Sequence, residues 1–187
     1  MASEYRVAAE SPFALLSDGQ IRAWYAYMKV QLRLRYEMNR QLRTGHGLSL
    51  ADYDVLVALI SEDDTTMSIS ALATRIGWER SRVSHHARRM SARGLVTLQT
   101  STTDRRSTDV SLTDLGRTTL GRASRGHAAL VRTMFFGALG DTRTAALAES
   151  FELIYEELIR HGTLPRPADH QGWSAGRGRV PCRMSSS

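Results

Sequence analysis

The chain has 187 residues with 25 Lys and Arg against 19 Asp and Glu, which gives a net charge of +6. This length suits one domain or two small packed ones, and the 42% hydrophobic content is typical of a globular protein. The longest apolar run, Val55 to Ile60, is too short to span a bilayer, and the first 20 residues do not form a secretory signal. The single cysteine, Cys182, argues against a disulfide scaffold, a Cys-ligated zinc site and a two-cysteine redox switch. We therefore expect a cytoplasmic protein that spans no membrane.

The chain opens with an extension, residues 1–17, followed by a long amphipathic helix within residues 18–46. Apolar residues recur there at three and four positions from Gly19 to about Thr44, and Gly45 and Gly47 end the pattern. A second helix is predicted from Ala51 to about Ser61, with Ser49 as its cap. Its expected apolar face consists of Tyr53, Leu56, Val57 and Ile60.

Residues 48–113 show the spacing of a helix-turn-helix followed by a hairpin. A short helix begins after Ser68, Gly77 permits a tight turn, and a further helix runs from about Glu79 to Arg93 and stops at Gly94. The runs 95–98 and 109–112 are rich in β-branched and apolar residues, so they predict an antiparallel hairpin that forms a wing.

Residues 114–162 predict two more helices, Asp114 to about Phe136 with Thr113 as its cap, and Thr142 to about His161. The fold class is therefore mainly α with a small β-hairpin wing. Residues 163–187 are rich in Pro and Gly without apolar periodicity, so we expect a flexible tail. Weak phosphate attraction is expected from its arginines, Arg166, Arg177, Arg179 and Arg183.

Positive charge is concentrated between residues 75 and 106, which hold eight arginines and only two acidic residues. Arginine supplies 24 of the 25 basic side chains, and its guanidinium group suits bidentate contacts with phosphate and guanine. A dense arginine cluster favours nucleic acid as the partner.

The helix from Glu79 to Arg93 offers different faces to the protein and to a partner. Val83, Ala87, Met90 and Gly94 share a narrow face that we expect to pack inward. The remaining polar side chains could reach base edges or phosphates in a major groove, with Arg82 suited to guanine and Arg89 to the backbone or the wing. The candidate contacts on this helix are Arg80, Ser81, Arg82, Ser84, His85, His86, Arg88 and Arg89.

The wing tip carries Asp104, Arg105 and Arg106. A narrow minor groove would attract its two guanidinium groups. We expect Asp104 to hold Arg89 or Arg106 in place by a charge-assisted hydrogen bond. No Cys, Asp or Glu stands at ligand spacing from the pair His85 and His86, so we expect DNA contact or solvent exposure there rather than a metal.

Residues 48 to 116 resemble the MarR family (multiple antibiotic resistance regulators), and with the flanking helices the resemblance extends over about residues 18 to 162. The segments that carry it are Ala71–Ala73, Arg80–Ser84, Arg93–Val96, Asp104–Arg106 and Leu112–Gly116. The resemblance implies a homodimeric winged-helix regulator, usually a repressor. The flanking segments 18–46 and 114–162 would form the dimer, and each protomer would place its recognition helix in a major groove of a pseudo-palindromic operator.

The resemblance also implies a small aromatic or acidic effector between the dimerisation helices and the winged unit. The residues expected to border that cleft are Trp24, Tyr25, Tyr27, Met28, His46 and Tyr53. Oxidation-sensing relatives use a cysteine in or near the first helix, and this chain has none there, so thiol sensing is not expected. No cofactor is expected.

The sequence leaves three other functions to consider. A winged-helix module could bind an acidic protein through its arginines, and a metal-responsive regulator could use His46, His127 or His161 with an acid such as Glu149. Catalysis is not expected, because the sequence contains no Gly-rich phosphate loop, Gly-x-Ser-x-Gly elbow, His-Glu-x-x-His or Cys-x-x-Cys motif.

Overall fold

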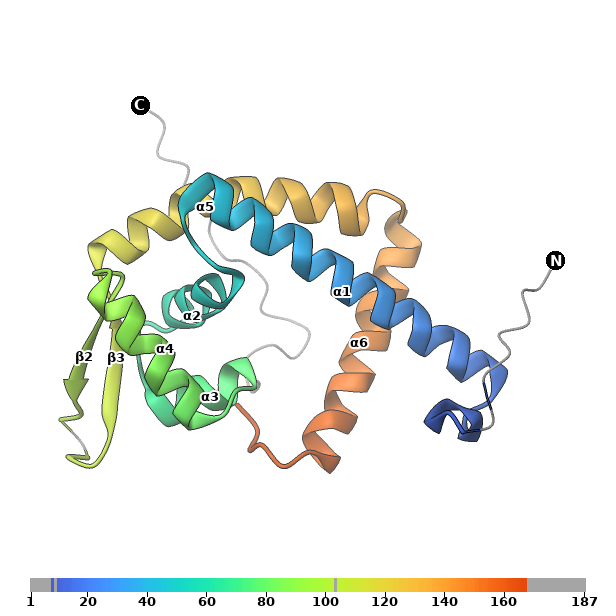
Figure 1. Cartoon of the computed structure of the whole chain (residues 1–187), viewed down its shortest axis with the longest axis horizontal. Coiled ribbons are helices and arrows are strands. Elements are labelled where there is room, and N and C mark those ends of the chain that lie inside the picture. Colours follow the sequence, from blue (N-terminus) through green and yellow to red (C-terminus); the bar gives the residue numbers. More distant parts are fainter. Residues whose placement is uncertain (1–7, 9, 103, 168–187) are drawn as a thin grey trace. The chain divides into compact units, whose positions relative to one another are not determined.

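The computed structural model describes residues 8, 10–102 and 104–167. Cys182 and the tail residues Arg177, Arg179 and Arg183 lie outside them. The chain divides into two compact units, Met1–Tyr53 with Thr118–Asp141 and Asp54–Arg117 with Thr142–Ser187. Figure 1 shows the elements of both in chain order. Within the described residues, no helix combines the length and apolar character that a membrane span requires.

The first unit contains a short 3-10 helix, η1 (Pro12–Leu15), and the long helix α1 (Asp18–His46). A reciprocal cap begins α1, because Gln20 N–H donates to Ser17 Oγ at 3.4 Å and Ser17 N–H donates to Gln20 Oε1 at 2.9 Å. Of the two glycines predicted to end the helix, Gly45 lies within its last turn and Gly47, whose φ of +64° is left-handed, caps it.

Helix α2 (Leu50–Ile60) begins with a second reciprocal cap. Asp52 N–H donates to Ser49 Oγ at 3.0 Å, and Ser49 N–H donates to the buried Asp52 carboxylate at 2.8 Å. The predicted apolar face was wrong at Val57, which is exposed, whereas Val55 and Leu59 are buried. Residues 55–60 are all apolar, so the sequence does not show which of them face solvent, and this explains the error.

Helices α5 (Asp114–Val131) and η2 (Arg132–Phe136, a π-helical turn) together span the predicted helix from Asp114 to Phe136. Thr113 caps α5 as predicted, because its Oγ1 accepts the Gly116 N–H at 3.0 Å. Helix α6 (Asp141–His161) follows the predicted bounds to within one residue.

The winged unit comprises β1 (Thr66–Ser68), α3 (Ile69–Ile76), α4 (Arg80–Ala92), β2 (Val96–Thr100) and β3 (Thr108–Leu112). The hairpin pairs Val96 with Leu112 at one end and Thr100 with Thr108 at the other. Strand β1 was not predicted, and it adds to the free edge of β3 to give the antiparallel order β1-β3-β2. This confirms a mainly helical fold with a small sheet, and its core contains the fully buried Leu72, Val83, Met90, Val96 and Val110.

Candidate nucleic-acid interface

The turn between α3 and α4 sets the direction of α4. Helix α3 ends at Gly77, whose φ is +67°, and the next N–H, that of Trp78, donates to Ala73 O at 2.9 Å. This left-handed glycine stop reverses the chain within three residues, so α4 starts at Arg80 and packs on α3 and β2. A side chain at Gly77 would be strained by the backbone conformation itself.

Helix α4 contains four arginines, two histidines and no acidic residue. Its buried side chains are Val83, His86, Ala87 and Met90. Ser84 is half-buried, and the exposed candidates are Arg80, Ser81, Arg82, His85, Arg88 and Arg89. One side of α4 therefore anchors the helix in the core while the other presents donors of lengths suited to base edges and phosphates.

His86 is a correction to the predicted contact set. Only 8% of the residue is exposed, and its ring lies edge-on to Trp78 with the ring centroids 5.4 Å apart. His86 follows Val83 by three residues and precedes Met90 by four, so it belongs to the inward face, which is wider than predicted. A buried ring there cannot reach a base edge itself.

Two arginines of α4 are held by neighbours that the sequence reading did not assign to them. The Arg82 guanidinium carbon lies 4.1 Å from the centroid of the Trp78 ring, which is a cation–π contact. The Arg89 Nη2 donates to His86 Nδ1 at 3.0 Å. The three-residue spacing between His86 and Arg89 on α4 is the signal that could have revealed the second contact, whereas Trp78 precedes the helix and gave no such signal.

Backbone hydrogen bonds join the described residues of the wing tip. Ser101 N–H donates to Ser107 O at 3.0 Å, and Ser107 N–H donates to Asp104 O at 2.8 Å. Asp104 was predicted to hold the side chain of Arg89 or Arg106, but its Oδ1 accepts the backbone N–H of Arg106 at 2.9 Å. This short carboxylate turn shapes the tip and leaves both Arg105 and Arg106 exposed.

The predicted effector residues form separate contacts within the first unit. Trp24 and Tyr27 pair with ring centroids 5.4 Å apart, and both are exposed. Tyr25 lies 5.5 Å from Phe13, and Met28 Sδ accepts from Gln31 Nε2 at 3.6 Å. The set therefore stays a prediction.

Tyr53, another of these candidates, stacks on the ring of His127 with the centroids 4.4 Å apart. Its hydroxyl lies 3.5 Å from Ser124 Oγ. Burial lowers the pKa of His127 below its usual value of 6.5, because desolvation penalises the charged ring. His46, the remaining candidate, is half-buried near the end of α1.

In the described part of the chain, the histidines considered for metal binding do not form a group that could hold an ion. Within the described residues, no group of three His, Cys, Asp or Glu side chains could hold an ion. His161 pairs instead with Glu157, one turn earlier on α6, at 3.2 Å. The described part of the structure therefore gives no support to a metal-responsive regulator.

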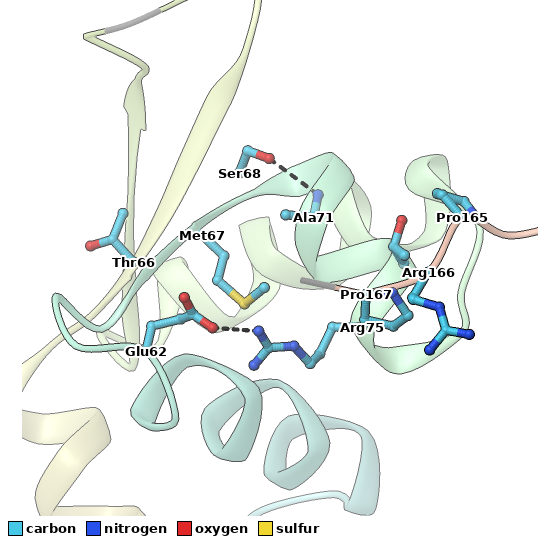
Figure 2. Close-up of a pocket in the computed structure, with 10 residues that line it drawn as sticks. Glu62, Thr66, Met67, Ser68, Ala71, Arg75, Pro165, Arg166 and Pro167 are labelled. Atoms are coloured by element: carbon cyan, nitrogen blue, oxygen red, sulfur yellow. Dashed lines mark hydrogen bonds and ion pairs between the residues drawn. The ribbon is translucent and has the colours of Figure 1, made fainter. Parts of the chain in front are cut away.

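A cavity of about 390 Å³ lies in the second unit beside β1 and α3 (Figure 2). The carboxylate of Glu62 holds the guanidinium of Arg75 on one side of it, and the segment after α6 lines the other side. Arg166 in that segment was predicted to lie in a flexible tail and attract phosphate, but it pairs with Glu156 at 2.8 Å while Pro167 is buried. The first residues of the tail thus belong to the folded unit.

The MarR family model matches residues 46–107. The crystal structure of AbsC, a MarR family transcriptional regulator from Streptomyces coelicolor, is 30% identical over 78% of this chain and 98% of its own, with a TM-score of 0.73. Another such regulator from Streptomyces coelicolor, solved in complex with DNA, is 28% identical over 80% of this chain and 97% of its own, with a TM-score of 0.75.

The transcriptional repressor CouR, solved on a 23-mer DNA duplex, is 27% identical over 75% of this chain and 98% of its own, with a TM-score of 0.64. No curated protein sequence matches the chain. The winged unit, the arginine-rich α4 and these relatives together show that the chain belongs to the MarR family of DNA-binding transcriptional regulators.

Proposed function

We propose that this protein is a homodimeric repressor that recognises a pseudo-palindromic operator through the exposed face of α4 and the tip of the wing. The observation that carries the proposal is the division of α4 into a buried apolar side and an exposed side with four arginines and no acid. A basic helix that is anchored in a core but open to solvent along one side suits a major groove.

The first turn of α4 is the part suited to reading bases. Arg80, Ser81 and Arg82 are exposed there, and the helix dipole adds positive potential at the same end. Arg82 can donate two hydrogen bonds to guanine, whereas contacts farther along a recognition helix tend towards phosphate. We therefore assign Arg82 and Ser81 to base recognition, and Arg88 and Arg89 to the backbone.

The wing supplies a second, less sequence-dependent contact. Arg105 and Arg106 stand exposed on a turn that the Asp104 carboxylate orders through the backbone. Guanidinium groups at a protruding tip suit the negative potential of a narrow minor groove. The two arginines would therefore strengthen binding to many sequences.

The proposed dimer rests on apolar side chains that a single chain leaves in water. On α6, Leu153, Ile154 and Leu158 are 72%, 54% and 63% exposed, and they line a groove of about 500 Å³. On α1, Leu32 and Tyr36 are 61% and 60% exposed. Helices with exposed apolar stripes are stabilised by a partner, and the family resemblance supports a second copy of the chain as that partner.

The experiment that tests the proposal is selection of bound duplexes from a random library with the purified full-length protein. We expect an enriched pseudo-palindrome with half-site centres about 10 base pairs apart, bound by two protomers. A parallel selection with Ser81→Ala and Arg82→Ala combined should lose that motif, whereas Arg143→Ala, an exposed arginine on α6, should keep it. Lack of enrichment by the unmodified protein would favour a module that binds an acidic protein.

A small aromatic or acidic effector remains part of the proposal. It would weaken operator binding only if it bound better to a dimer whose recognition helices were differently spaced. Adding salicylate or benzoate to the selected complex and measuring the apparent Kd tests this, with a rise expected. If none of these compounds changes the apparent Kd for the operator, this class of effector is contradicted.

A further inference from the structure

We infer that Trp78 and His86 are positioning residues that hold Arg82 and Arg89 in the orientations used on DNA. The inference rests on the proposed function and adds to it two residues that act through these arginines. It concerns four residues, namely Trp78, which lies just before α4, and Arg82, His86 and Arg89, which lie on α4.

Trp78 is fixed before α4 begins. It is half-buried directly after the left-handed Gly77, and its backbone N–H donates to Ala73 O at 2.9 Å. The backbone hydrogen bond fixes the main chain at Trp78, and the ring of the buried His86, 5.4 Å away and nearly perpendicular at 85°, limits rotation of the indole. The indole is therefore a rigid surface at the start of the recognition helix.

Arg82 lies over this indole ring. Its guanidinium carbon lies 4.1 Å from the centroid of the indole ring, although the arginine itself is exposed. The Arg82 guanidinium can still donate hydrogen bonds to DNA, because the cation–π contact is not itself a hydrogen bond. The contact with Trp78 restricts the rotamers of Arg82 in the free protein. Less side-chain entropy is therefore lost when Arg82 binds DNA.

His86 restricts Arg89 by a hydrogen bond. A guanidinium group has no acceptor, so the 3.0 Å contact requires that His86 Nδ1 accept from Arg89 Nη2. The ring must then carry its proton on Nε2 in this arrangement. Since His86 is only 8% exposed and lies against Trp78, one packed pair of rings orients both arginines.

The free protein gives a test that does not involve DNA. In spectra of the ¹⁵N-labelled protein, the Arg82 Nε–H resonance should be moved upfield by the indole ring current, and Trp78→Leu should abolish that shift. Trp78→Phe should retain part of it. An Arg82 resonance at the position of the other exposed arginines in the unmodified protein would overturn the inference.

The functional test is a double-mutant cycle on the duplex most enriched by the unmodified protein. Trp78→Leu should weaken binding roughly three- to tenfold, in keeping with a cation–π contact, but should have less than about a twofold effect when Arg82→Ala is already present. Trp78→Phe should restore most of the loss. Equal losses in both backgrounds would mean that Trp78 only supports the fold, and would overturn the inference.

His86 is tested with a matched pair of variants. His86→Leu keeps an apolar group but removes the acceptor, whereas His86→Asn places a carbonyl oxygen near the position of Nδ1. We expect His86→Leu to weaken binding roughly threefold and His86→Asn to restore it, with both effects lost when Arg89→Ala is present. Equal binding by the two variants would contradict the role of His86.

The outcomes separate this inference from the function on which it rests. An unmodified protein that enriches no duplex refutes the proposed function and with it the inference. A protein that enriches a duplex but shows additive losses in the cycles refutes the inference alone.

Discussion

Gly116 is a position where a single added carbon should damage the winged unit. It is buried in the first turn of α5, and a Cβ atom there would lie 2.1 Å from Leu95 O and 2.9 Å from Leu112 Cδ1. The nearest atom belongs to the backbone, so no side-chain rotation can relieve the clash. The Leu95 carbonyl also accepts a hydrogen bond from Thr113 Oγ1 at 2.9 Å, which links α5 to the segment before β2.

The size of the effect follows from two opposing contributions. Overpacking of this kind costs about 3 kcal/mol because the backbone must move, whereas alanine in place of glycine contributes about 1 kcal/mol of helix propensity. We therefore expect Gly116→Ala to lower the free energy of unfolding by about 2 kcal/mol. For a chain of this size that corresponds to a fall in Tm of about 4–8 °C.

The assay is thermal and urea unfolding at one fixed protein concentration, because the stability of a dimer depends on concentration. The matched control is Gly121→Ala in the same helix, where a Cβ atom would meet nothing within 4 Å. That control should raise the stability by about 0.5–1 kcal/mol. A Gly116→Ala protein as stable as the unmodified one would refute the packing described for this junction.

Three other changes test the wing, the dimer and a buried ring. Replacing Arg105 and Arg106 with Ala should lower the slope of log K against log salt by up to about two units per protomer, measured by fluorescence anisotropy with several duplexes. Leu158→Glu should shift the protein from dimer to monomer in sedimentation, because it places a charge on the exposed apolar stripe of α6. For His127 the lowered pKa means that the unfolded chain binds more protons near pH 6.5, so Tm should fall as the pH drops through that value. His127→Phe should remove part of this fall.

Each of these has a control and a contradicting result. Arg143→Ala is the control for the wing variant and should leave the salt slope unchanged. An unchanged slope in the wing variant as well would mean that the wing does not touch DNA. A Leu158→Glu protein that stays dimeric would remove α6 from the proposed interface, and Glu152→Gln on the same helix serves as its control. A pH profile of Tm identical in the unmodified and His127→Phe proteins would show that another group is responsible, and the exposed His85→Gln controls for loss of a histidine.

Local signals in the sequence were sufficient for most of the fold. The helix after Ser68, the turn at Gly77 and the stop at Gly94 each follow from capping and glycine chemistry, and all are present. The hairpin followed from two β-branched runs. Strand β1 could not be predicted, because three residues have no measurable period and the strand exists only through its pairing with β3.

The candidate interface was predicted less completely than the fold. An inward face read from Val83, Ala87 and Met90 was one residue too narrow, and so His86 was placed among the contacts. Asp104 was assigned to an arginine side chain because of charge, but it accepts the backbone N–H of Arg106. Aspartate often accepts a backbone N–H two residues later in a turn, and this was the signal for the observed contact. The contacts of Tyr53 with His127 and of Tyr25 with Phe13 depend on tertiary packing and had no sequence signal, whereas Trp24 and Tyr27 are three residues apart on α1, a spacing that predicts contact.

The central claim is that the exposed side of α4 reads base edges. The most direct test is to measure the affinity of the unmodified protein and of Arg82→Ala for every single-base variant of the selected duplex. The account predicts that one position in each half-site loses its discrimination, by about 1–3 kcal/mol, while the other positions keep theirs. Two profiles that differ only by a uniform factor would contradict it, because Arg82 would then contact the phosphate backbone alone.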